Sequence, residues 1–327
     1  MTEVRFLREQ AIRGLINPAQ ALERTRAAFA ALARGEVVLP EVMFFDLKSR
    51  NGEVHAKGAY IEGSPFFSLK VASGFYDNAN LGLPVTAGVV LVFNAETGQL
   101  DTILFDNGYL TELRTGAAGA LAADLLARTQ IEQVGIYGTG SQARYQLEAL
   151  VGVRTPSRIV VWGRSPERAR AYADEMQDRI GVPIEVAIDP QQAARGSGII
   201  VTATSAQSPI LLDSWVEPGT HVTAMGSDVP DKHEVDVNLL RRATVIADSL
   251  RQCLTQGEIH QAVKAGAMVE TDVYELGEIA AGMKPGRTSE NEITLVDLTG
   301  VGVLDAAVAS HVVSMANESN LGETIET

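Results

Sequence analysis

The spacing of apolar residues predicts helices and strands whose kind changes along the chain. Residues 18–34 repeat their apolar positions at helical spacing, with Asn17 placed to cap this helix and Gly35 to end it. From residue 37 onward, short β-rich runs are separated by Gly, Asn and Pro. They predict strands at 54–61, 66–71, 88–93 and 100–105.

A long helix and a strictly alternating region follow. The Ala- and Leu-rich run 111–127 predicts a helix. Apolar strands and helices then alternate, at 134–137, 142–150, 158–162, 166–179 and 198–204, with further strands near 221–225 and 244–247. This alternation is typical of a parallel, doubly wound sheet. The Ala- and Val-rich run 305–315 predicts another helix.

The length and the pattern together indicate two domains. A chain of 327 residues is too long for one ordinary core. The fold class is α/β, with a Rossmann domain expected at residues 126–303. We expect this domain to be inserted into a second, α+β domain that consists of residues 1–125 and 304–327.

Composition narrows the class of protein. Hydrophobic residues make up 46% and charged residues 21%, which is a globular balance. The net charge of −14 argues against nucleic acid or an anionic membrane as partner, because both repel an acidic surface. The apolar runs are far shorter than the ~20 residues of a membrane span, and the charged N-terminus is unlike a secretory signal. Because Cys253 is the only cysteine, no internal disulfide is possible, and we expect a cytoplasmic protein.

The turn after the strand at 134–137 carries a dinucleotide-binding fingerprint. Its sequence is GTGSQA, and the residues assigned to the cofactor are Gly138, Gly140, Ser141, Gln142 and Ala143. The first glycine makes the tight turn, the second lets the backbone approach a pyrophosphate, and the alanine allows close packing of helix on strand. The helix N-terminus then faces the phosphates. Glycine-rich turns are common by chance, but here a strand and a helix flank the motif as it requires.

The end of the next strand bears on the choice between NAD and NADP. An acidic residue there binds the ribose 2′-hydroxyl of NAD, and this chain has Gly163 instead. Arg164, Ser165 and Arg168 could together hold a 2′-phosphate. Arg168 could equally belong, with Glu167, to a solvated helix face. The pattern favours NADP(H) over NAD(H).

Further motifs complete a resemblance to a known family. They are KVASGF at 70–75, GLP at 82–84, YLTELRTGAA at 109–118, GSDVPDK at 226–232, ELGE at 275–278 and DLTG at 297–300. With the fingerprint, they resemble the ornithine cyclodeaminase/μ-crystallin family over nearly the whole chain, and most closely its ectoine-utilisation cyclodeaminase-like members. The resemblance implies a homodimer in which the Rossmann domain is inserted between two parts of a substrate-binding and dimerisation domain.

The resemblance implies that Lys70 and Arg114 contact the substrate. Lys70 comes at the end of the apolar strand residues 66–69, where a solvated lysine is not expected. The family's lysine grips the substrate carboxylate or polarises the C2 nitrogen. Arg114 would lie in the first helical turn, where a cation opposes the dipole, and a bidentate hold on a carboxylate or pyrophosphate would compensate. Thr115 is assigned to the cofactor. Lys70 and Arg114 could each instead form a surface salt bridge.

A second group of implied site residues lies in the Rossmann region. Asp228 follows the strand near 221–225 at the carboxyl edge of the sheet, where ligands bind. The family's aspartate exchanges protons with the reacting centre, whereas local sequence alone would favour a turn or cap residue. The other implied residues are Gly226, Lys232 and Thr204 for the cofactor and Thr299 and Gly300 for the substrate pocket. The hydroxyls among them could equally bond to local backbone.

Two positions depart from the ornithine-specific members of the family. Where those members have an arginine for the carboxylate, this chain has Phe44, and where they have a glutamate for the distal ammonium, it has Lys57. A lysine would repel that ammonium and attract an anion or a carbonyl, which disfavours ornithine. Lys57 could also point to solvent, because the face of its strand is not settled by the pattern.

Three functions remain open at this point. The first is an imine reductase or amino-acid dehydrogenase that moves a hydride between NAD(P)H and C2 of a small amino or imino acid. The second is a cyclodeaminase, a lyase that oxidises and re-reduces the same carbon with bound NAD. The third is a non-catalytic NADPH-binding protein of the μ-crystallin kind, against which the presence of Lys70, Arg114 and Asp228 argues. The five histidines show no metal-ligand spacing, so no metal is predicted.

Overall fold

A computed structural model describes residues 3–326 and divides into two compact units. One unit joins the chain up to Arg114 to the chain from Val301 onward, and the other is Thr115–Gly300. The division therefore falls within helix α3 (Tyr109–Leu126), and the expected boundary at residue 125 lies inside the second unit. An uninterrupted Ala- and Leu-rich helix continues from one unit into the other, so no change of composition marks the boundary.

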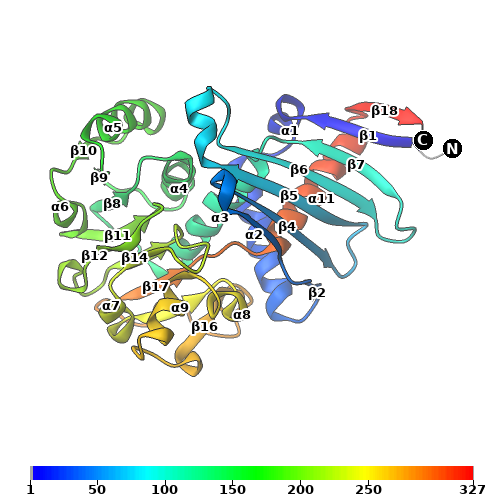
Figure 1. The fold of residues 1–327 in the computed structure, drawn as a ribbon. Helices are drawn as coiled ribbons and strands as arrows, with labels where there is room; N and C mark the ends of the chain where they lie inside the picture. Colours follow the sequence, from blue (N-terminus) through cyan, green and yellow to red (C-terminus); the bar gives the residue numbers. More distant parts are fainter. Residues whose placement is uncertain (1–2, 327) are drawn as a thin grey trace. The chain divides into compact units, whose positions relative to one another are not determined.

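The first unit contains an eight-stranded sheet in the order β18-β1-β7-β6-β5-β4-β2, with β3 paired to β4 (Figure 1). The strands are β1 (Glu3–Arg8), β2 (Val37–Val38), β3 (Met43–Leu47), β4 (Gly52–Ile61), β5 (Phe66–Phe75), β6 (Thr86–Asn94), β7 (Leu100–Phe105) and β18 (Glu323–Glu326). The helices are α1 (Glu9–Leu15), α2 (Pro18–Ala33) and α11 (Gly302–Glu318). Helix α11 packs on β4, β5 and β6, and α2 packs on α11.

Alternation along β5 explains the two faces of this sheet. Phe66, Ser68 and Lys70 are buried, whereas Leu69, between them, is exposed. The strand runs on through the small residues 72–74, which have low β-propensity, so the strand predicted at 66–71 was too short. Lys70 consequently lies in the middle of β5 and not at its end.

Local signals place α2 as predicted. Asn17 accepts a hydrogen bond from the amide of Gln20, whose side chain accepts one from the amide of Asn17, and Pro18 occupies the first turn. The strands β1, β3 and β18 were not predicted. Their charged or exposed residues give no clear alternation, and pairing with distant partners defines them.

The second unit is a Rossmann fold, as predicted from the alternation. Its parallel sheet has the order β10-β9-β8-β11-β13-β17-β15-β16. These strands are β8 (Gln133–Tyr137), β9 (Arg158–Trp162), β10 (Ile184–Val186), β11 (Ser197–Thr202), β13 (His221–Ala224), β15 (Thr244–Ala247), β16 (Val273–Glu275) and β17 (Thr294–Asp297). The strands β12 (Gln207–Leu211) and β14 (His233–Val235) form a separate pair.

Helices cover this sheet and enclose two apolar clusters. Beside α3 they are α4 (Ser141–Val151), α5 (Pro166–Ile180), α6 (Pro190–Ala194), α7 (Val237–Arg242), α8 (Leu250–Cys253), α9 (Gly257–Lys264) and α10 (Leu276–Ala280). One cluster includes Leu147 and Tyr172, and the other Leu239 and Ile259. Because the chain proceeds from β8 to β9 on one side and reaches β11 on the other, the strand order reverses between β8 and β11, where ligands bind in such sheets. Within residues 3–326, no helix is long and apolar enough to cross a membrane.

Candidate active site

A buried ion triad lies between the sheet and helix α11 of the first unit. Lys70 Nζ is 3.0 Å from Asp305 Oδ1 and Oδ2, and Arg114 Nε is 3.0 Å from Asp305 Oδ1. The three side chains are 4%, 6% and 2% exposed in the order Lys70, Arg114, Asp305. Lys70 and Arg114 are therefore brought together by a carboxylate that was not among the predicted site residues. A single acid within the apolar run of α11 was the available signal.

The triad changes the proton affinity of its members. Burial lowers the pKa of Lys70 to about 8, although the Asp305 carboxylate offsets part of the decrease. Arg114 and Lys57 add to the decrease, because like charges disfavour another cation. Burial would raise the pKa of Asp305, but Arg114 and Lys70 outweigh it and the pKa is lowered. Lys70 is thus an amine with a pKa of about 8 beside the guanidinium of Arg114.

Two expectations about these cations are corrected. Arg114 lies beyond the first turn, because α3 begins at Tyr109, so the helix dipole does not explain its placement. Asp305 balances its charge instead, and the surface salt bridge considered for Lys70 and Arg114 is ruled out by their burial.

The structure also settles the face on which Lys57 lies. Lys57 is paired directly with Lys70 across β4 and β5, and paired residues of antiparallel strands point to the same face. Its charge contributes to the pKa of both Lys70 and Asp305. Lys57 is partly buried, which excludes the solvent-facing alternative. Phe44 pairs with His55 on the neighbouring strand, and their ring centroids are 4.7 Å apart.

The glycine-rich turn of the second unit has room for a pyrophosphate. Gly138 has φ +118°, and a Cβ on it would come within 2.5 Å of the carbonyl oxygen of Ala203, so only glycine fits. A Cβ on Gly140 would meet open space. Helix α4 starts at the next residue, Ser141, and no side chain caps its first amides. Ala143 is fully buried, as close packing of helix on strand requires. These residues fit a dinucleotide, whose phosphates would lie at the N-terminal end of α4.

The residues that follow β9 keep two cations exposed. The Ser165 hydroxyl accepts a hydrogen bond from the Arg168 amide at 3.3 Å and so caps α5. Arg164 and Arg168 are exposed, and neither guanidinium has an ion pair among the described residues. A Cβ on Gly163 would come within 2.9 Å of the Thr139 Cγ2 atom, so a side chain at the usual position of the acid would require the Thr139 side chain to shift.

Asp228 lies in the loop between β13 and β14 and pairs with Lys232. The distance from Lys232 Nζ to Asp228 Oδ1 is 2.5 Å, and the Asp228 side chain is 45% exposed. Lys232, which was predicted to bind the cofactor, thus contacts Asp228, which was predicted to exchange a proton. The neighbouring Ser227 hydroxyl donates to Glu258 Oε1, also at 2.5 Å, which anchors the loop next to Asp228.

Buried carboxylates that were not predicted hold the loops at the carboxyl edge of the sheet. Glu234 accepts hydrogen bonds from the Thr202 and Thr204 hydroxyls and from the Thr204 and Gly226 amides, at 2.7–2.8 Å. Glu258 accepts from the Glu234 amide at 2.7 Å. Burial raises the pKa of each carboxyl to about 7, and the Glu258 charge adds to the shift of Glu234. No motif marked Glu234, which lies in β14, or Glu258, which lies in α9, because a glutamate normally faces water.

A third buried acid fixes the last predicted pocket residues. Asp248 accepts hydrogen bonds from the Thr299 hydroxyl at 2.9 Å and the Gly300 amide at 2.6 Å. The hydroxyls of Thr204 and Thr299 therefore donate to carboxylates, and the Thr204 hydroxyl also accepts a hydrogen bond from the local backbone amide of Ala206 at 3.2 Å. Thr115, at the start of the second unit, accepts a hydrogen bond at its carbonyl from Gln146 at 2.8 Å. Among residues 3–326, no three His, Cys, Asp or Glu side chains are grouped as metal ligands.

A Rossmann unit with an intact dinucleotide turn, joined to a sheet domain with a buried lysine–arginine–aspartate triad, defines a class of nicotinamide-dependent enzymes. Residues 3–320 match the model of the ornithine cyclodeaminase/mu-crystallin family. This chain belongs to that family.

Three similar proteins show the range of the family. A protein of Sinorhizobium fredii, named an uncharacterized cyclodeaminase, is 41% identical and covers 100% of both chains. The structure of an archaeal alanine dehydrogenase dimer with bound NAD has a TM-score of 0.93 and 33% identity, over 99% of each chain. A Thermococcus litoralis Δ1-pyrroline-2-carboxylate reductase, in complex with NADH and L-proline, has a TM-score of 0.93 and 30% identity over 98% of this chain and 100% of its own.

Proposed function

We propose that this enzyme is an imine reductase or amino-acid dehydrogenase acting at C2 of a small amino or imino acid. The observation that carries the proposal is the buried pair of Lys70 and Arg114, in which the lysine has a pKa of about 8. Such a pair matches a substrate that combines a carboxylate with a neighbouring nitrogen that must gain or lose a proton. A bound nicotinamide dinucleotide supplies or accepts the hydride.

The roles of the protein residues follow from their charges. Arg114 holds the substrate carboxylate, and Lys70 contacts the carboxylate or the C2 nitrogen. Asp228 exchanges a proton at the substrate nitrogen, which must be protonated when C2 receives a hydride. Thr299 and Gly300 line the pocket for the substrate.

The cofactor contacts are part of the same proposal. The turn at 138–143 holds the pyrophosphate, while Arg114, Thr115, Thr204, Gly226 and Lys232 complete the cofactor site. We further propose NADP(H) rather than NAD(H), because the exposed Arg164 and Arg168 have no acidic partner in the part of the chain that the structure describes. The ratio of the dissociation constants of NADPH and NADH measures this preference directly. Tighter binding of NADH than NADPH would contradict it.

Lys57 limits the substrate side chain. It lies on the same face as Lys70, so a distal ammonium on the substrate would face two cations in a partly buried site. A substrate with an uncharged, carbonyl-bearing or anionic side chain is favoured.

A cyclodeaminase of the ectoine-utilisation type is the second candidate, and the relative named a cyclodeaminase favours it. Absorbance at 340 nm separates the two functions, with purified protein, NADPH or NADH, and 2-oxo acids plus amines as substrates. Net loss of the reduced cofactor supports the reductase. Ammonia release without net cofactor change supports the lyase. Tight cofactor binding with neither outcome indicates a non-catalytic binding protein.

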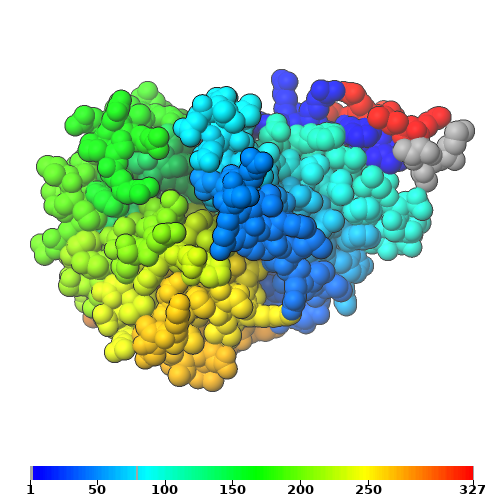
Figure 2. Space-filling view, viewed as in Figure 1, coloured from blue at the N-terminus to red at the C-terminus, as the bar shows by residue number. Residues whose placement is uncertain are grey.

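We also propose a cytoplasmic homodimer. The face of the first sheet opposite α11 presents the apolar side chains of Leu69, Phe67, Leu91 and Ile103, of which Leu69 is exposed. Figure 1 shows α11 behind β4–β6, and Figure 2 shows the segment of β3, in blue, at the surface of the viewed side. An apolar sheet face of this kind is a typical subunit interface.

A further inference from the structure

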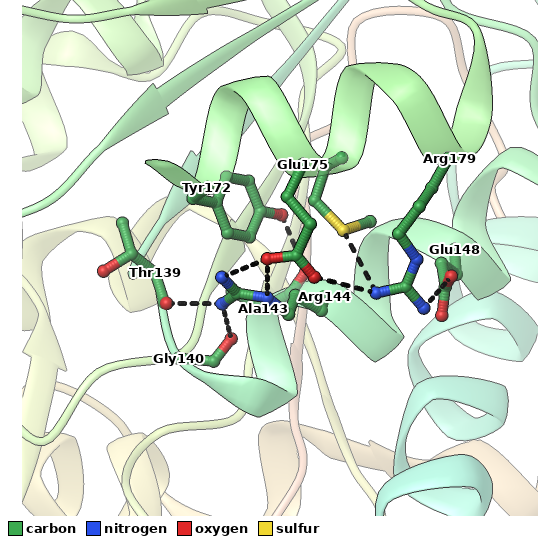
Figure 3. Close-up of polar contacts among 9 residues, drawn as sticks. Thr139, Gly140, Ala143, Arg144, Glu148, Tyr172, Glu175 and Arg179 are labelled. Atoms are coloured by element: carbon green, nitrogen blue, oxygen red, sulfur yellow. Dashed lines mark hydrogen bonds and ion pairs between the residues drawn. The ribbon is translucent and has the colours of Figure 1, made fainter. Parts of the chain in front are cut away.

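Arg144, the fourth residue of α4, contacts the backbone of the dinucleotide turn (Figure 3). Its Nη1 donates hydrogen bonds to the carbonyl oxygen of Thr139 at 2.6 Å and to that of Gly140 at 3.1 Å. These two carbonyls belong to the peptides between the first glycine of the fingerprint and the start of α4. None of the predicted roles includes this arginine.

The other edge of the guanidinium is held by helix α5. Arg144 Nε and Nη2 donate to Glu175 Oε2 at 2.9 and 2.7 Å, and the guanidinium carbon lies 5.1 Å from the centre of the Tyr172 ring. The Tyr172 hydroxyl donates to the carbonyl oxygen of Ala143 at 2.9 Å. Hydrogen bonds from Arg144 lower the pKa of Glu175, so this carboxylate stays charged. The planar guanidinium is therefore fixed on two edges and one face.

This placement has an electrostatic cost that the contacts offset. A cation at the N-terminal end of a helix opposes the helix dipole, and this position normally favours an acid. Glu175 neutralises the charge of Arg144, and the two backbone carbonyls accept hydrogen bonds that the guanidinium would otherwise donate to water. The arginine is directed at the backbone of the turn and is paired with an acid, so it is not arranged as a ligand of the phosphates.

A turn that binds pyrophosphate must direct its amides toward the phosphates and its carbonyls away from them, because a carbonyl oxygen repels an anion. Gly140 gives the turn no side chain that would restrict its peptides, and no side chain caps the first amides of α4. Without a donor on the outside, the two peptides could rotate. Arg144 supplies that donor for both carbonyls at once.

We propose that Arg144 is a positioning residue of the cofactor site, held by Glu175, that keeps the amides of the dinucleotide turn directed toward the pyrophosphate. The proposal rests on the binding of a nicotinamide dinucleotide but not on the reaction that follows. It is tested by binding, so a failure of the proposed reductase activity would leave the test intact.

The experiment compares Arg144→Gln and Arg144→Lys with Arg179→Gln as the matched control. Arg179 also pairs with Glu175 on α5, at 3.1 Å, and with Glu148 on α4, but it does not contact the turn. Dissociation constants are measured for NADPH and NADH by nicotinamide fluorescence, and for ADP-ribose and AMP by calorimetry. Unfolding midpoints are recorded for every variant.

We expect Arg144→Gln to weaken the dinucleotides and ADP-ribose about tenfold, which corresponds to about 1.4 kcal/mol. AMP, which lacks the pyrophosphate, is expected to change less than threefold. The affinity of Arg144→Lys should lie between those of the wild-type protein and Arg144→Gln, because a lysine keeps the charge but lacks the planar set of guanidinium donors. Arg144→Gln also leaves the Glu175 carboxylate less compensated, and the part of the loss due to that charge should be screened by salt. The part due to the released turn should persist at high salt. The cofactor KM should rise with kcat at saturation unchanged.

Several outcomes would overturn the proposal. One is ADP-ribose affinity in Arg144→Gln within twofold of that in Arg179→Gln. Another is an equal loss for AMP and ADP-ribose. A loss that disappears at high salt would mean that charge alone, and not the released turn, accounts for it. If Arg144→Gln does not fold, the ADP-ribose affinity of Arg144→Lys tests the proposal instead. Wild-type affinity in Arg144→Lys would also contradict the proposal.

Discussion

Replacing Asp305 by asparagine removes the carboxylate that pairs with both Lys70 and Arg114 while keeping the shape of the side chain. Lys70 is 4% exposed and its pKa is about 8 instead of 10.5, which corresponds to about 3 kcal/mol against the charged amine at pH 7. Removing one partner of a buried ion pair costs about 3–5 kcal/mol. We expect Asp305→Asn to lose this amount of unfolding free energy at pH 6, a large part of the 5–15 kcal/mol typical of a domain.

The loss should depend on pH, and its sign follows from the lysine. Asp305 raises the pKa of Lys70, so its removal lowers that pKa further below 8. In either protein the unfolded lysine binds its proton more tightly than the folded one, so stability rises with pH between the folded and the unfolded pKa. The variant begins this rise at lower pH. The deficit should therefore shrink from pH 6 to pH 9, without vanishing, because Arg114 stays charged.

Urea denaturation at both pH values, followed by circular dichroism, measures the effect. Asp46→Asn is the matched control, because Asp46 is 43% exposed and pairs at 3.3 Å with Lys48, which is 85% exposed, and an exposed pair contributes at most about 1 kcal/mol. The pH at which kcat/KM changes because Lys70 loses its proton should also be lower in Asp305→Asn than in the wild-type protein. A deficit below 1 kcal/mol at both pH values would refute the claim that Asp305 balances these cations.

Other predictions concern separate parts of the molecule. The pKa of Glu234 is about 7 in the folded protein against 4.5 in an unfolded chain, so the unfolding free energy should fall as the pH rises from 4.5 to 7. Glu234→Gln should make the unfolding free energy less dependent on pH in this range. An unchanged pH dependence would contradict the raised pKa of Glu234. Lys57→Glu should raise kcat/KM for substrates with a distal ammonium at least tenfold relative to those without one, as measured by competition between the two. Gly138→Ala should weaken cofactor binding more than tenfold by fluorescence titration, because the new Cβ would be 2.5 Å from the Ala203 carbonyl oxygen. Leu69→Lys should shift the mass measured by light scattering from dimer to monomer, and an unaltered dimer would place the interface elsewhere.

Local patterns were sufficient to predict much of this protein. The alternation after residue 133 predicted the Rossmann unit, the capping residues around Asn17 predicted α2, and the glycine-rich sequence at 138–143 predicted the turn between β8 and α4. Each of these signals lies within a few residues of the structure it specifies, because capping, turn geometry and periodicity depend on neighbouring positions. The family motifs likewise carried the assignment of Lys70 and Arg114.

The partners of those residues could not be derived in the same way. Asp305 is 235 positions from Lys70 and 191 from Arg114, so no local pattern relates them. The face of Lys57 depends on the register of β4 against β5, and a slip of one residue would have reversed it. Burial of Glu234 and Glu258 raises their pKa, and burial is a property of the packed chain. Periodicity along the chain specifies helices and strands, whereas charge balance at the site arises only where distant segments meet.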